Sequence, residues 1–118
     1  MNAFILGFPR LLARGLASRL LALSPSTVVH MLVSPEQAEA FQAFSATLET
    51  TQRLRLHARI GRAFDTDLGL DAADANAMLA DTTHVFHAGQ LSQGPRAGLK
   101  RHNVDALGRL VELCLDMP

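Results

Sequence analysis

The sequence predicts an α/β protein with a doubly wound parallel sheet of about four strands in the order 3-2-1-4. Short apolar segments of strand length alternate with segments of helical period along the 118 residues. One strand segment, residues 27–33, is apolar on both faces, which is typical of a parallel strand covered on two sides. Right-handed crossovers between such strands give this order most simply.

The first strand and helix meet within the stretch ILGFPRLLA, residues 5–13. Residues 2–7 form an apolar strand that ends at glycine. Pro9 fits the first turn of the helix, because its missing N–H would have no partner there. The helical period then continues to Ser24 and Pro25 through Leu11, Leu12, Gly15, Leu16, Arg19 and Leu20.

The second strand, residues 27–33, leads into a second helix and a third strand. Ser34 supplies a helix cap and Pro35 a first-turn proline, so we expect the helix to run to about Leu48. Apolar and polar residues alternate from Leu54 to Ile60, which predicts a strand with one polar face.

A further helix and strand follow over residues 70–89. Asp71 is suited to cap the helix, and Met78 and Leu79 are expected to face inward. Residues 83–89, THVFHAG, predict a fourth strand that again ends at glycine.

The last predicted element is a helix after the polar loop of residues 92–103. Its spacing directs six apolar side chains toward the core: Val104, Leu107, Leu110, Val111, Leu113 and Leu115. Cys114 lies among them and has no second cysteine to pair with, which favours a buried thiol in a reducing, cytoplasmic compartment over a reactive one.

Composition excludes several classes of function. Eleven basic and 11 acidic residues give a formal charge of zero, so no bulk field attracts nucleic acid or an acidic membrane surface. No uninterrupted apolar run reaches the roughly 18 residues of a membrane span. The five histidines form no pair four residues apart on one helix, so we expect no zinc site.

The amino-terminal segment has a competing interpretation. Residues 1–35 contain three arginines and no acid, and residues 10–23 are amphipathic, as in an organelle-targeting leader followed by a small helical body. The apolar segments on either side of this helix have strand length, which favours a folded strand–helix–strand unit.

Three segments in this order resemble the amino-terminal half of an extended short-chain dehydrogenase/reductase. They are residues 4–21, 67–89 and 102–114, and the likeness extends over essentially the whole chain. It is closest to the fatty acyl and thioester reductases, the male-sterility type. The resemblance implies a single, partial Rossmann-like domain over residues 1–118 that binds NAD or NADP and stops before the catalytic half.

The family's cofactor turn usually has glycine, glycine, and glycine or alanine at intervals of three residues. Gly7, Arg10 and Ala13 stand at these positions. The middle one normally lets the pyrophosphate approach bare backbone. The Arg10 side chain either swings aside and donates to a phosphate or fills the cofactor's space, and we favour weakened or lost binding. By resemblance, the turn residues near the cofactor are Gly7, Phe8, Pro9, Arg10 and Leu11.

The adenosine end departs from the family as well. A polar or charged residue after the second strand usually reads the ribose or its phosphate, and here Ser34 and Glu36 follow that strand. Gly61 and Arg62 stand where the family has Gly-Asp facing the adenine. These residues leave the choice between NAD and NADP open.

At the fourth strand, His87, Ala88 and Gly89 resemble the family's Phe-His-Ala-Ala run, whose small residues let the nicotinamide ribose approach the backbone. His87 is either close to the cofactor or only a polar residue at a strand end. Asn103 matches an asparagine that helps to organise the family's active site, and it is equally suited to cap the last helix.

The family's reaction uses a Tyr-x-x-x-Lys pair as its acid catalyst. This sequence has no tyrosine, and its only lysine is Lys100, so we expect no catalysis by this chain alone. Two hypotheses follow. The chain is the nucleotide-binding half of a thioester or acyl reductase, or it is a non-catalytic module that pairs with itself or with a homologous reductase through an exposed sheet edge.

Overall fold

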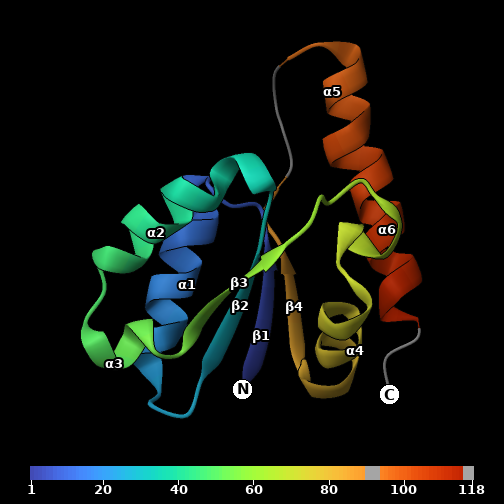
Figure 1. Cartoon of the computed structure of the whole chain (residues 1–118). Helices are drawn as coiled ribbons and strands as arrows, with labels where there is room; N and C mark the ends of the chain where they lie inside the picture. The colour runs from blue at the N-terminus through green and yellow to red at the C-terminus, as the bar shows by residue number, and fades with distance from the viewer. Residues whose placement is uncertain (90–93, 116–118) are drawn as a thin grey trace.

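The computed structural model describes residues 1–89 and 94–115. They form three layers, a parallel sheet between two layers of helices (Figure 1). The strand order is β3-β2-β1-β4, and every pairing is parallel. The predicted fold class is therefore confirmed. The strands are β1 (Asn2–Leu6), β2 (Val28–Val33), β3 (Leu56–Ile60) and β4 (His84–His87).

Helices cover both faces of the sheet (Figure 1). One face carries α1 (Leu11–Leu23), α2 (Ala38–Ala46) and α3 (Thr50–Arg53). The other carries α4 (Ala72–Asp81) and α6 (Ala106–Cys114). A further helix, α5 (Arg96–Lys100), extends past the ends of the strands and is joined to α6 by a π-helical segment, Arg101–Asp105. Short 3₁₀ helices lie at Pro35–Gln37 and Thr66–Gly69.

Alternation along the strands produces two separate cores. In β1, Ala3 and Ile5 pack against α1, whereas Phe4 and Leu6 pack under α4 and α6. All four side chains are fully buried. Because both faces of the central strand are covered, its sequence is apolar throughout.

The first helix begins later than predicted and turns a different face to the sheet. Pro9 precedes the helix instead of opening it: Arg10 is the N-cap, and the Phe8-Pro9 bond is cis. The residues facing the sheet are the small Ala13 and Ala17, together with Leu21. Leu11 and Leu12 are 76% and 69% exposed.

The second helix is shorter than predicted. The Ser34 side chain makes no capping hydrogen bond, and α2 ends at Ala46. The guanidinium of Arg53 in α3 donates to the carbonyls of Ser45 and Leu48, so these groups are satisfied without a longer helix. The third strand accordingly starts at Leu56, two residues after the predicted Leu54.

Two predictions for the helix after β3 are confirmed. The Asp71 carboxylate accepts a hydrogen bond from the Asp74 backbone N–H at 2.7 Å, which confirms the predicted cap. Met78 is buried as expected. The Leu79 side chain, and residues 92 and 93 of the predicted loop, lie outside the described part of the chain.

The last helical run begins at Arg96, inside the predicted loop, and buries fewer apolar residues than expected. Leu110 and Leu113 are buried, and Cys114 is half-buried, where burial raises the pKa of its thiol. Six apolar positions span more than one face of a helix, and only one face contacts the sheet. The side chains left exposed are Val104 (61%), Leu107 (43%), Val111 (50%) and Leu115 (79%).

Candidate functional site

A cavity of about 330 Å³ lies at the carboxyl ends of the strands. Parallel α/β sheets bind their ligands at this edge, where the loops leave the strands. The predicted site residues that line the cavity are Gly7, Phe8, Pro9, Arg10, Ser34, Arg62, His87 and Gly89. Residues widely separated in the sequence therefore meet at one end of the sheet.

The turn after β1 requires its glycine for a reason internal to the protein. Gly7 has a φ of +123°, and a Cβ at this position would lie 2.4 Å from the carbonyl oxygen of Ala88. Such a contact is impossible without displacing the end of β4. Gly7 thus lets the turn after β1 pack against the segment that follows β4.

The second turn position does not require glycine. Arg10 has φ −62° and ψ 149°, which any residue adopts. Its N–H donates to the Gly7 carbonyl at 2.9 Å, and its own carbonyl accepts from the Arg14 N–H at 3.1 Å. The backbone therefore accommodates a side chain here, and that side chain lines the cavity.

An ion pair bridges the ends of β2 and β3. The Arg62 guanidinium donates from Nη1 to Glu36 Oε2 at 3.0 Å and from Nη2 to Glu36 Oε1. Its hydrogen bonds hold the pKa of the Glu36 carboxyl at about 2, well below its ordinary value. Glu36 therefore remains charged throughout the physiological range.

His87 presents unused hydrogen-bonding groups at the end of β4. Both ring nitrogens are buried, and neither has a hydrogen-bond partner among the described residues. Burial lowers the pKa of this imidazole, which favours the neutral ring at pH 7. A neutral imidazole carries one donor and one acceptor, so a ligand in the cavity could use either.

Aromatic residues that the sequence analysis missed complete one wall. The Phe64 and His102 rings meet edge to face with centroids 5.9 Å apart, and the Arg101 guanidinium lies 5.6 Å from the centre of the Phe64 ring. Phe64, His102 and Ala106 line the cavity. They come from the loop after β3 and from the last helical run, and no local motif marks them.

The match to known proteins agrees with this geometry. Residues 7–118 match the protein family described as Male sterility protein, a family of NAD-binding domains. The chain belongs to the male sterility protein family. This membership confirms the predicted resemblance to the male-sterility type. No curated protein sequence matches the chain.

Solved structures share the fold of this male sterility family chain, and two of them are a terminal R domain and a reductase domain. The terminal R domain of the myxalamid PKS-NRPS pathway has a TM-score of 0.78 at 15% identity, over 95% of this chain. The PhqB reductase domain from Penicillium fellutanum has a TM-score of 0.76 at 18% identity, over 99% of this chain. The alignments span 31% and 34% of those two chains, about a third of each.

Three predicted site residues do not line the cavity of the male sterility family chain. Leu11 borders a different groove, between α1 and α2. The backbone carbonyl of Ala88 packs against Gly7 in the turn after β1. Asn103 lies within the π-helical segment, seven residues after the helical run begins at Arg96, so the prediction that it caps the helix is wrong.

Residues 1–89 and 94–115 contain neither a cluster of metal-ligating side chains nor a membrane-spanning helix. Within these ranges no three histidine, cysteine or acidic side chains gather closely enough to hold a metal ion. The same residues form no helix that is long and apolar enough to cross a membrane.

The cavity of the male sterility family chain fits a nicotinamide dinucleotide in several respects. Its volume falls within the range of roughly 300–1,000 Å³ that is usual for ligand sites. A Cβ on Gly89 would lie 3.3 Å from the Gly7 Cα, so two glycine backbones approach closely at its edge. The unpartnered nitrogens of His87 offer polar contacts. The Arg10 side chain is the feature that fits least well.

Proposed function

We propose that residues 1–118 form a single, partial domain that binds NAD(H) or NADP(H) as the nucleotide-binding portion of a thioester or acyl reductase. The observation that carries this proposal is the cavity, which brings the β1 turn together with the ends of the other strands. Gly7, Arg10, Ser34, Arg62, His87 and Gly89 would contact the dinucleotide. A bound dinucleotide would supply the hydride for reduction.

Catalysis is expected to require residues outside these 118. The chain has no tyrosine to act as proton donor, and Lys100, on α5, does not line the cavity. Asn103 would at most support an active site completed elsewhere. The lone, half-buried cysteine is consistent with a cytoplasmic location, which belongs to the same proposal.

Arg10 is expected to weaken nucleotide binding. A side chain at this turn position reduces the space in which a pyrophosphate can meet the backbone, whereas an added hydrogen bond returns little in a solvent-exposed site. Arg10→Gly should therefore tighten the binding of NADH or NADPH by about tenfold, equivalent to roughly 1.4 kcal/mol. Isothermal titration calorimetry of both nucleotides with the wild type and the variant measures this change.

The matched control is Arg19→Ala, which removes an exposed arginine from the same helix at a distance from the cavity. It should leave both affinities unchanged. Weaker binding by Arg10→Gly would show that the arginine assists the phosphate contact. Absence of binding in folded wild type and folded variant would overturn the proposed function itself.

A second candidate function rests on the sheet edge. Within the described residues β4 pairs with β1 on one side, and its other side has no paired strand. An unpaired strand edge is a surface suited to association with another chain. This supports a non-catalytic module that pairs with a second copy or a homologous reductase. Sedimentation at micromolar concentration tests self-association, and a strictly monomeric protein would count against it.

A further inference from the structure

The polar residues at the adenosine end differ in arrangement from a simple phosphate-binding site. Ser34 directly follows β2, and the Glu36 carboxylate, two residues later, contacts the guanidinium that emerges from the end of β3. In doubly wound sheets a group at the end of the second strand meets the adenosine ribose. An acid there accepts a hydrogen bond from the 2′-hydroxyl, whereas an arginine there attracts a 2′-phosphate.

Both an acid and an arginine are present here, and they form an ion pair with each other. The two terminal nitrogens of Arg62 donate to the two oxygens of Glu36, so the end of the guanidinium that faces Glu36 is already paired with a carboxylate. The Arg62 side chain lines the cavity and is 37% exposed, and Glu36 is 60% exposed. The pair is therefore accessible to a nucleotide from solvent.

We propose that the Glu36–Arg62 pair makes this site select NAD(H) over NADP(H). The inference rests on the proposed function, because Arg62 lines the same cavity and Glu36, which does not line it, is paired with Arg62. A 2′-phosphate would have to displace Glu36 from Arg62, and the displaced carboxylate would remain beside the phosphate and repel it. A 2′-hydroxyl meets neither obstacle, since it donates to a Glu36 oxygen while the pair stays closed.

The ionisation of Glu36 supports this selection. Its pKa of about 2 keeps the carboxylate charged at every pH at which the nucleotides are studied. The carboxylate is thus charged whenever it is paired with Arg62. The ionisation of Glu36 should therefore not change the preference for NADH over NADPH across the neutral pH range.

The test compares affinities for the two nucleotides in matched variants. NADH and NADPH fluorescence reports binding without interference, because the chain contains no tryptophan or tyrosine. In the wild type the Kd for NADPH should exceed that for NADH by about tenfold or more. Glu36→Gln frees Arg62 from its charged partner and should reduce this ratio at least about tenfold, chiefly by tightening NADPH binding.

Arg62→Gln is the complementary variant. It leaves Glu36 charged and removes the only cation of the pair, so the ratio should stay at or above that of the wild type. Both side chains are exposed, so circular dichroism should show both variants folded, with unfolding temperatures close to that of the wild type. A wild type that prefers NADPH, or an unchanged ratio in Glu36→Gln, would overturn the inference.

A fragment pair separates this inference from the proposed function. 5′-AMP and 2′,5′-ADP differ only in the 2′-phosphate, and NMR titration at millimolar concentration detects weak binding of either. Binding without discrimination between the fragments would refute the selection by Glu36 and leave nucleotide binding intact. If neither fragment nor dinucleotide binds the folded wild type or folded Arg10→Gly, the proposed function fails and this inference fails with it.

Discussion

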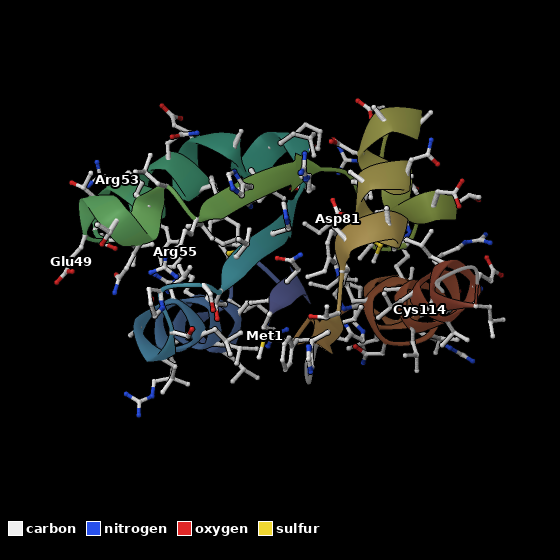
Figure 2. All side chains as sticks on the ribbon, turned by 90° about the horizontal axis from the view of Figure 1, so that it is seen from below. Met1, Glu49, Arg53, Arg55, Asp81 and Cys114 are labelled. Carbon is white, nitrogen blue, oxygen red and sulfur yellow. The ribbon has the colours of Figure 1, made fainter. Side chains whose placement is uncertain are left out.

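The two ends of the sheet are built in different ways. At the amino end, a single side chain ties three elements together (Figure 2). Arg55, just before β3, donates from its guanidinium to carbonyls of α1, of the turn before β2 and of α3. The acceptors are the carbonyl oxygens of Leu21 (3.0 Å), Ser24 (2.9 Å), Thr27 (2.8 Å) and Thr51 (3.2 Å).

Hydrogen bonds also link β1 to β4 at this end. The Asn2 N–H donates to Thr83 Oγ1 at 3.0 Å, and the Thr83 N–H donates to the Asn2 carbonyl at 2.8 Å. The Asn2 amide reaches the Asp81 carbonyl at 3.0 Å. Polar groups at the amino end are thus satisfied by the protein itself.

The carboxyl end leaves polar groups available. His87 has two buried nitrogens without a partner among the described residues, and the Glu36–Arg62 pair faces solvent. The cavity lies between them. The comparison teaches that one end stabilises the fold while the other keeps hydrogen-bonding capacity for a ligand.

The largest expected effect on stability comes from a substitution at the carboxyl end of the sheet. Gly7→Ala combines a positive φ with a Cβ 2.4 Å from the Ala88 carbonyl oxygen, so the backbone must shift. Strain and overpacking of this kind cost about 3 kcal/mol in the free energy of unfolding. Urea denaturation followed by far-ultraviolet circular dichroism measures the loss. Nucleotide binding should be lost as well, because the turn borders the cavity.

Gly15→Ala is the matched control for that substitution. Gly15 lies within α1, and a Cβ there would meet no atom within 4 Å. Replacing glycine by alanine inside an exposed helix should stabilise the protein by about 0.5–1 kcal/mol. Equal stabilities of Gly7→Ala and the wild type would show that the two segments do not need the close approach.

Features that depend on local sequence patterns could be predicted, and features that depend on contacts between separate segments could not. The strand order follows from local patterns, because apolar periodicity and parallel crossovers leave few alternatives. The turn at Gly7 was predicted from a glycine at a strand end, whereas a place for His87 near the cofactor was predicted only from the resemblance to the family. The end of α2 could not be predicted, since it depends on Arg53 reaching carbonyls five and eight residues earlier.

Features that depend on distant contacts escaped prediction in the same way. Phe64 and His102 meet across 38 residues of sequence to form one wall of the cavity. The exposure of Val111 and Leu107 depends on how much of α6 the sheet can cover, which helical periodicity does not reveal. Periodicity predicts that an apolar face exists, and the neighbouring elements determine which part of it is buried.

A smaller loss of stability is expected from a substitution at the amino end of the sheet, and it tests whether that end stabilises the fold. Arg55→Met keeps the aliphatic stem of the side chain but removes the donors to four carbonyls. Water can reach part of this region, so we expect a loss of about 2 kcal/mol in the free energy of unfolding. Exposed Arg19→Met is the control and should change stability by less than about 0.5 kcal/mol.

Nucleotide affinity is the measurement that tests the separation of the two ends. Arg55 lies at the edge of the sheet opposite the cavity, so folded Arg55→Met should bind NADH and NADPH as the wild type does. An undiminished unfolding free energy would show that the guanidinium is dispensable to the fold. A changed affinity in a stably folded variant would show that the strands transmit strain between their ends, because the substitution touches no group that lines the cavity.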